Sequence, residues 1–242
     1  MERLYVVMPA YNEEKNIEKV VRSWHAVLEK VDKTARLLIV DDGSTDDTYN
    51  IIWDLQRELP QMEFQYKKNS GHGATVLFAY EYAMARGATY IFQTDSDGQT
   101  NPEEFLEFWK QREEYDMIIG SREQRGDGFF RKFASKVLKF VIKITLHTDV
   151  EDANTPFRLM KTETLKKYMP KIPKDFYLSN ALITALFVKY KEKVKFIPIT
   201  FQARQAGKNS INFEKLVHTG WETLRDFRKI NKNLEDKKAK EG

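Results

Sequence analysis

The chain of 242 residues contains no cysteine. This absence excludes a disulfide-stabilised scaffold, a zinc or iron–sulfur site with cysteine ligands, and a cysteine nucleophile. The sequence also lacks an unbroken run of about 18 apolar residues, the length that a membrane-spanning helix requires. Its first residues reach Glu13 and Glu14 without the apolar segment of a signal peptide. These absences predict a soluble, cytoplasmic protein.

Neither sign of charge dominates the composition. Forty Lys and Arg residues against thirty-six Asp and Glu residues leave a net charge of +4, too small an excess to indicate a nucleic acid partner. A hydrophobic content of 41% and an aromatic content of 13% supply a sizeable core and exclude wholesale disorder. No internal repeat or Gly/Ser-rich linker divides the chain, so we expect one domain over residues 1–230 and a flexible charged tail at 231–242.

The first half of the chain alternates short apolar runs with segments of helical periodicity. Apolar runs typical of buried strands are Leu4–Met8, Arg36–Val40, Glu63–Lys67 and Ala88–Thr94. Helices are expected between them, at 17–31, from about 45 to 59, and from the glycines at 71–73 to Met84. This order predicts βαβ crossovers, and hence an α/β fold with a mostly parallel central sheet flanked by helices.

The second half is less regular. Strands are expected at Asp116–Gly120, Thr155–Met160 and Val194–Phe201. Helices are expected at 101–112, Phe129–His147 and Ser179–Lys189, and from about 212 to 230.

Polar residues follow each strand of the first half, at Pro9–Glu14, Asp41–Asp47, Asn69–Gly73 and Asp95–Gln99. Ligands bind at the carboxyl ends of parallel strands, although any one of these segments also suits an ordinary turn. Asp95 and Asp97 are more specific, because residues i and i+2 of an extended segment face the same side. They can converge on one divalent cation, which prefers oxygen ligands, and Gln99 is close enough to contribute.

Three other classes of site fit these residues poorly. An EF-hand loop counted from Asp95 would need Glu at its twelfth position, which is Leu106. A haloacid-dehalogenase-type phosphatase would need D-x-D-G-T after the first strand, whereas this motif follows the fourth and has Gln99 in place of Thr. The glycine-rich fingerprints of a dinucleotide site and of a P-loop are absent.

Four motifs together resemble glycosyltransferase family 2, whose members have the nucleotide-diphospho-sugar transferase fold called GT-A. They are PAYNEE (9–14), VDDGSTDDT (40–48), the glycine pair at 71–73 and TDSDGQTNPEE (94–104). Later motifs at 120–122, 152–158 and 204–210 extend the resemblance to about residue 215 and look most like the dolichyl- or polyprenyl-phosphate sugar transferases. Thr155-Pro156-Phe157-Arg158 departs from the Ser-Gly-Phe-Arg that is usual there.

The resemblance implies that residues 1–99 bind the nucleotide sugar and residues 100–230 the acceptor. The nucleotide-sugar site would comprise Pro9, Tyr11, Glu13, Asp41, Asp42, Asp95 and Ser96. The resemblance further implies Mg²⁺ or Mn²⁺ held by Asp95 and Asp97, with Gln99 beside them, on the diphosphate of a UDP- or GDP-linked donor. Such a metal would neutralise the leaving group.

Cations in the later motifs suit phosphate recognition, because Arg binds phosphate in a bidentate manner and Lys acts as a mobile point charge. They are Arg122, Arg158, Arg204 and Lys208, with Arg158 also a catalytic candidate. The catalytic base stays open, since residues 176–183 contain no carboxylate. Asp152 and Asp175 are candidates, and a turn residue and a helix cap explain them equally well. A polyprenyl phosphate acceptor would need no base, because its oxygen is already anionic.

Residues 129–147 hold five Lys or Arg residues and no acid. On a helix, one stripe carries Lys132, Lys136, Lys139 and Lys143, and the other side carries Phe130, Phe133, Val137, Val141 and Ile144. This pattern is typical of a helix at an anionic membrane surface, and also of a core-packed helix with a solvated lysine edge. With the resemblance it predicts peripheral association with the inner face of a membrane, alone or through a separate membrane partner protein.

We therefore expect an inverting, metal-dependent glycosyltransferase that moves a sugar from a nucleotide-diphospho-sugar to a polyprenyl phosphate. One alternative is a family-2 enzyme with a soluble or polysaccharide hydroxyl acceptor. A nucleotidyltransferase would need a glycine-rich, basic first loop, whereas Pro9–Glu14 is acidic. A non-catalytic basic module for lipid or nucleic acid would leave the acidic strand ends unexplained.

Overall fold

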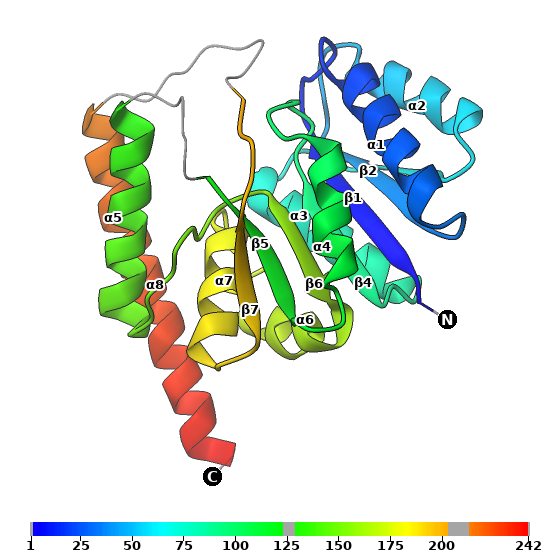
Figure 1. Ribbon diagram of the computed structural model, residues 1–242. Coiled ribbons are helices and arrows are strands. Elements are labelled where there is room, and N and C mark those ends of the chain that lie inside the picture. Colours follow the sequence, from blue (N-terminus) through cyan, green and yellow to red (C-terminus); the bar gives the residue numbers. More distant parts are fainter. Residues whose placement is uncertain (1, 123–128, 203–212, 242) are drawn as a thin grey trace.

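The computed structural model describes the backbone of residues 2–122, 129–202 and 213–241, and the side chains of residues 2–122, 133–202 and 220–236 (Figure 1). Within these ranges seven strands form one sheet in the order β3-β2-β1-β4-β6-β5-β7. The strands are β1 (Leu4–Ala10), β2 (Arg36–Asp41), β3 (Met62–Tyr66), β4 (Tyr90–Thr94), β5 (Met117–Ser121), β6 (Phe157–Lys161) and β7 (Val194–Pro198).

The sheet is mostly parallel, as the sequence predicts. β1 pairs in parallel with β2 and β4, β2 with β3, and β5 with β7. β6 runs antiparallel to both of its neighbours, β4 and β5. Its first residues therefore lie at the carboxyl end of β4, where Phe157 is opposite Thr94 and Arg158 is opposite Gln93.

Helices cover both faces of the sheet (Figure 1). They are α1 (Ile17–Val31), α2 (Thr48–Glu58), α3 (His72–Ala85), α4 (Phe105–Lys110), α5 (Phe129–Leu146), α6 (Thr162–Tyr168), α7 (Ser179–Lys189) and α8 (Phe213–Glu241), with short 3₁₀ turns at Pro102–Glu104 and Met169–Lys171. The sequence did not predict α6. The long apolar strands fit a sheet buried on both sides, because successive side chains alternate between its faces.

Two apolar cores follow from this alternation. Val6 and Met8 pack with α1, α2 and α4 on one face, and Tyr5 and Val7 pack with α3, α7 and neighbouring helices on the other. The first core contains a cluster of aromatic rings around the fully buried Trp24, whose centroid lies 5.3 Å from that of Phe92, 5.9 Å from Phe105 and 6.0 Å from Phe157. These contacts fix α1 against the centre of the sheet.

α5 and α8 lie side by side at one end of the molecule (Figure 1). The structure corrects the expectation of a flexible tail at 231–242, because α8 continues to Glu241 and buries Leu234. Leu234 extends the stripe of Phe227 and Ile230 at helical spacing, and all three join the same core. Among the described residues, no helix combines the length and apolar character needed to cross a bilayer.

Replacing Leu234 by Ala should lower the free energy of unfolding by about 2 kcal/mol, because it removes a buried side chain from the core that it shares with Phe227 and Ile230. The neighbouring exposed Asn233→Ala is the matched control and should leave stability nearly unchanged. Urea denaturation followed by circular dichroism measures both. Equal midpoints for the two variants would show that the end of α8 contributes nothing to the fold.

Candidate active site

A cavity of about 380 Å³ opens at the carboxyl ends of β1, β2 and β4, beside the first turn of α3. We call it the strand-end cavity. Seven of the predicted site residues line it, namely Pro9, Tyr11, Glu13, Asp42, Asp95, Ser96 and Asp97. Asn69 and His72, from the predicted strand-end segment Asn69–Gly73, also line it, as does Thr75, although none of the three was named as a site residue. The structure thus brings together all four predicted strand-end segments, which are up to about ninety residues apart in the sequence.

Asp95 is held by a chain of buried hydrogen bonds. The Tyr80 hydroxyl donates to Oε1 of Gln93 (2.9 Å), and Nε2 of Gln93 donates to Oδ1 of Asp95 (3.4 Å). Burial raises the pKa of the Asp95 carboxyl, and the side chains of His72, Arg122 and Arg158 offset part of that rise electrostatically. A buried carboxylate that is held in one orientation binds a cation well, because the cation offsets the free energy that burial of the negative charge costs.

The segment after Asp95 is fixed to the sheet on two sides. The Ser96 hydroxyl donates to the carbonyl oxygen of Pro9 (2.9 Å), which anchors the segment to β1. Oδ1 of Asp97 accepts from the backbone N–H of Gln99 (3.1 Å). The side-chain amide of Gln99 donates to the carbonyl oxygen of Gln202 (2.7 Å), and Gln99 does not line the strand-end cavity. Its predicted metal contact stays a prediction.

The carboxylates of Asp95 and Asp97 fit a hard divalent cation of the Mg²⁺ or Mn²⁺ kind. Among the described residues, no group of three or more His, Cys, Asp or Glu side chains is arranged to hold a metal ion. A cation at this pair would therefore take its other ligands from water or from a phosphate group. That requirement suits a metal that binds together with a diphosphate.

The structure separates the two acids at the end of β2. Asp41 is fully buried, does not line the strand-end cavity, and accepts from the backbone and hydroxyl of Ser44; burial raises its pKa. Asp42 does line the cavity. Its two oxygens accept from the backbone N–H groups of Ser70 and Gly71, at 2.9 Å each, and it pairs with Lys67. The prediction that Asp41 also faces the nucleoside is therefore not supported.

Tyr11 and Glu13 differ in what they can offer a ligand. The Tyr11 side chain is 47% exposed at the rim, so its ring face is available for stacking. Glu13 is buried, and its Oε2 accepts from the Asn16 amide (2.8 Å) while its backbone N–H donates to Thr48 (2.8 Å). Glu13 thus joins the entry of α1 to the start of α2 at the edge of the cavity.

Arg122 and Asp152 form a bidentate ion pair, with 2.9 Å from Nε to Oδ2 and 2.9 Å from Nη2 to Oδ1. Both side chains are largely buried, and the guanidinium also lies over the ring of Phe201, 5.1 Å from its centroid. Arg122 was predicted to bind phosphate and Asp152 to act as a base. The pairing links the two roles, because both carboxylate oxygens of Asp152 accept from Arg122, whereas it uses only two of the five N–H donors of the guanidinium.

Arg158 occupies a different environment from the one predicted. It is fully buried, and its five N–H donors are used by the carbonyl oxygens of Ala153, Thr155 and Asn180 and the hydroxyl of Thr184. Burial lowers its pKa. The expectation that Arg158 contacts a phosphate or the reacting atoms is corrected, because the guanidinium is enclosed by protein and holds β6 to the start of α7.

The remaining predicted residues lie elsewhere. Asp175 is exposed in the turn before α7 and does not line the strand-end cavity. Arg204 and Lys208 lie outside the described residues. The sequence reasoning passed over His72, although the glycines on both sides of it marked the start of a helix at a strand end. It had no signal for Gln93 and Tyr80, whose contact depends on how α3 packs on β4.

Replacing Arg158 by Lys should destabilise the protein by about 3 kcal/mol or more, since one ammonium group cannot satisfy the buried acceptors that the guanidinium satisfies. Arg225→Lys, at a side chain that is 76% exposed, is the matched control and should be nearly neutral. Thermal and urea denaturation measure both variants. A fully stable Arg158→Lys protein would contradict the structural role.

Comparison with known proteins agrees with this geometry. A family model described as glycosyl transferase family 2 matches residues 5–169. The undecaprenyl-phosphate 4-deoxy-4-formamido-L-arabinose transferase of Salmonella paratyphi A is 23% identical over 221 residues, which cover 90% of this chain and 65% of that protein. The putative glycosyltransferase CsbB of Bacillus subtilis is 24% identical over 224 residues, covering 92% and 66%. The chain thus spans about 65% of the length of these relatives.

Solved structures with similar folds are glycosyltransferases of the GT-A class. Glucosyl-3-phosphoglycerate synthase from Mycobacterium tuberculosis, in complex with Mn²⁺, UDP-glucose and phosphoglyceric acid, aligns with a TM-score of 0.66 at 17% identity, covering 94% of this chain and 80% of that one. S. aureus TarS in complex with UDP aligns with a TM-score of 0.62 at 18% identity, covering 94% and 65%. At this identity the likeness shows the fold, and it confirms the predicted GT-A architecture.

The family model matches more than half of the chain, and the matched part includes all the residues that line the strand-end cavity. The chain therefore belongs to glycosyl transferase family 2.

Proposed function

We propose that this protein transfers a sugar, with inversion, from a nucleotide-diphospho-sugar to a polyprenyl phosphate, and that it requires a divalent metal at Asp95 and Asp97. The observation that carries this proposal is the strand-end cavity, whose lining combines the exposed aromatic ring of Tyr11 with the carboxylates of Asp95 and Asp97. The names of relatives support it, since they include an undecaprenyl-phosphate sugar transferase and a synthase solved with Mn²⁺ and UDP-glucose.

Two sets of residues in the cavity can bind different parts of the nucleotide sugar, the nucleoside and the diphosphate. The Tyr11 ring can stack on the base, and Asp42 can accept from a base N–H or a ribose hydroxyl. Asp95 and Asp97, from the segment after β4, would hold Mg²⁺ or Mn²⁺, which when bound neutralises the charge of the departing diphosphate. The hydrogen bonds from Gln93 to Asp95 and from Ser96 to Pro9 keep this segment in place while the donor enters.

The positions of the two candidate bases, Asp152 and Asp175, favour a phosphate acceptor over an alcohol. Asp152 is paired with Arg122, and Asp175 lies outside the cavity. An alcohol acceptor would need a base to remove its proton, whereas a phosphate oxygen is already an anion at neutral pH. A lipid-linked acceptor lies in a membrane, and the exposed side chains of α5 and α8 could attach the protein to one.

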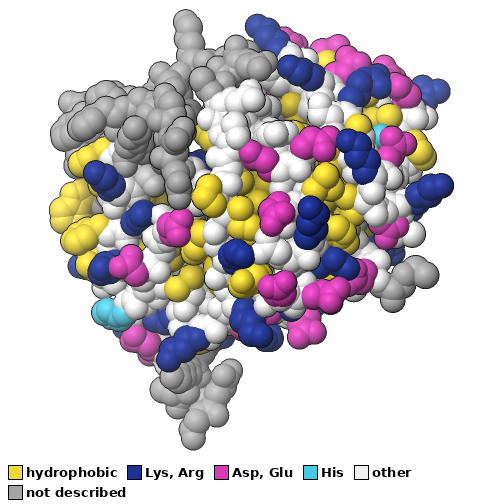
Figure 2. All heavy atoms as spheres, viewed as in Figure 1, with side chains coloured by type: hydrophobic (Ala, Val, Ile, Leu, Met, Phe, Trp, Pro, Cys, Tyr) yellow, Lys and Arg dark blue, Asp and Glu magenta, His cyan; other side chains and the backbone are white. Residues whose placement is uncertain are grey.

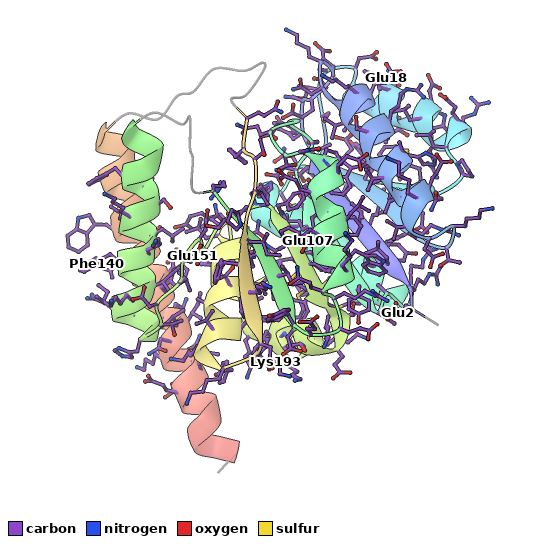
Figure 3. The ribbon with its side chains drawn as sticks, viewed as in Figure 1. Glu2, Glu18, Glu107, Phe140, Glu151 and Lys193 are labelled. Atoms are coloured by element: carbon purple, nitrogen blue, oxygen red, sulfur yellow. The ribbon has the colours of Figure 1, made fainter. Side chains whose placement is uncertain are left out.

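The exposed surface of α5 and α8 carries large apolar side chains, namely Phe133, Phe140, Ile144 and Trp221. We call this surface the α5–α8 aromatic face. Phe140 is 62% exposed and Trp221 66%, and Figure 3 shows Phe140 pointing away from the sheet. Figure 2 shows hydrophobic and basic side chains at the edge of the molecule where α5 and α8 lie. Aromatic residues exposed beside cations favour the interface of a membrane.

This surface differs from the two stripes predicted for residues 129–147. Val141 is buried in the core rather than exposed on the apolar side. Lys139 donates to the carbonyl oxygen of Glu151 (2.8 Å) and Lys143 pairs with Asp149 (2.8 Å), so these two lysines have local partners. The side chain of Lys132 lies outside the described residues. The membrane attachment that we propose therefore depends on aromatic insertion more than on the lysine stripe.

Replacing Asp97 by Ala should reduce transfer by about 100-fold or more, because loss of a metal ligand removes several kcal/mol of charge stabilisation. It should also abolish the Mn²⁺-dependent thermal stabilisation of the protein by nucleoside diphosphates. The exposed Asp54→Ala on α2 is the matched control and should behave as the unmodified protein. Near-normal turnover of Asp97→Ala would show that the metal assignment is wrong. Comparing nucleoside diphosphates with different bases in the thermal assay would identify the nucleotide of the donor.

Replacing both Phe140 and Trp221 by Glu should weaken co-sedimentation with anionic vesicles by about tenfold or more, because two interfacial aromatic side chains become charged. Trp53→Glu, at a residue on α2 that is 49% exposed, is the matched control and should not change vesicle binding. If the unmodified protein fails to bind vesicles and transfers sugar to a soluble hydroxyl acceptor, the lipid acceptor is wrong and the alternative family-2 activity holds.

A further inference from the structure

The strand-end cavity is rich in acids and poor in bases. Of the described residues that line it, four carry carboxylates (Glu13, Asp42, Asp95 and Asp97), and none is Lys or Arg. His72 is the lining side chain that can present a positive or strongly polarised N–H group. A diphosphate that enters such a cavity is repelled by the acids. Each hydrogen-bond donor that faces the diphosphate therefore contributes strongly to its affinity.

His72 lines the cavity beside Asp95. It is the first residue of α3, and its Nε2 lies 3.8 Å from Oδ1 of Asp95, beyond normal hydrogen-bonding distance. Half of the His72 side chain is exposed, so the ring leans toward the metal-binding pair while one edge stays open to a ligand. Thr75, one turn later on α3, lines the same wall.

The backbone around His72 brings α3 unusually close to the segment before α7. Gly71 has a φ of +87°, which side chains with a Cβ rarely adopt. A Cβ added to Gly73 would lie 2.2 Å from the carbonyl oxygen of Phe176, so only glycine fits there. These two glycines let the first turn of α3 begin at the cavity wall. Its N–H groups have no acceptor within the helix, and the helix dipole adds to the attraction for an anion.

We propose that His72 is a diphosphate-binding residue, which donates a hydrogen bond from its ring N–H to the β-phosphate of the nucleotide sugar. This role rests on the proposed function. As the anomeric carbon bonds to the acceptor oxygen, its bond to the diphosphate oxygen breaks and the electron pair stays on the diphosphate. The hydrogen bond from His72 stabilises that added charge without transfer of a proton, and it requires only that the ring nitrogen facing the phosphate carries a hydrogen.

The test compares a nucleoside diphosphate with the corresponding monophosphate, each titrated calorimetrically into the protein in the presence of Mn²⁺. His72→Ala should weaken diphosphate binding by about tenfold, the effect of one hydrogen bond to a charged group, and change monophosphate binding less than about twofold. His72→Lys should recover most of the diphosphate affinity. His147→Asn, at an exposed histidine at the end of α5, is the matched control and should change neither affinity.

A second measurement separates His72 from the metal. Binding of Mn²⁺ alone, followed by electron paramagnetic resonance, should be the same in the unmodified protein and in His72→Ala. A loss of Mn²⁺ binding would make His72 a metal ligand and overturn the proposal. Equal losses for diphosphate and monophosphate, or no loss for either, would also overturn it while leaving the transferase standing. An unmodified protein that binds no nucleoside diphosphate would overturn the proposed function as well.

Discussion

The guanidinium of Arg158 is the interaction on which the rest of the site depends. β6 enters the sheet antiparallel to β4, so Arg158 lies opposite Gln93 at the end of the strand that leads to Asp95. Its five hydrogen bonds tie β6 and the segment before it to the start of α7. These bonds hold the part of the fold behind the acids in one arrangement, and the buried positive charge of Arg158 offsets part of the cost of the Asp95 charge.

This arrangement lets the protein concentrate negative charge where a ligand binds. Carboxylates at neighbouring strand ends repel one another and lose hydration, which costs free energy in the absence of a ligand. Asp42 is stabilised by Lys67 and two backbone N–H groups, and Asp95 by the amide of Gln93. The site is thus arranged in advance for a cation and for a diphosphate that arrives with it, which is the arrangement that electrostatic catalysis requires.

The sequence predicted the donor half of the molecule well, for a reason specific to parallel sheets. Apolar runs alternating with amphipathic segments leave little choice but βαβ units, and the carboxyl ends of their strands share one edge. Tyr11, Asp42, Asp95 and Asp97 could therefore be assigned to one site although they are distant in the chain. The helical spacing of Phe227, Ile230 and Leu234 is also visible in the sequence. The many charged residues around Leu234 nevertheless led to the prediction of a flexible tail.

The sequence by itself determined the alternating α/β order and the clustering of acids at the strand ends, because both follow from local patterns. Tertiary structure alone decided which side chains face the ligand. The antiparallel direction of β6 depends on its pairing with β4 and β5. Because of this direction Arg158 is buried, whereas the sequence predicted a cation that faces a ligand. Asp41 and Asp42 are adjacent in the chain, yet only the position of the strand end within the fold sends one into the core and the other into the cavity.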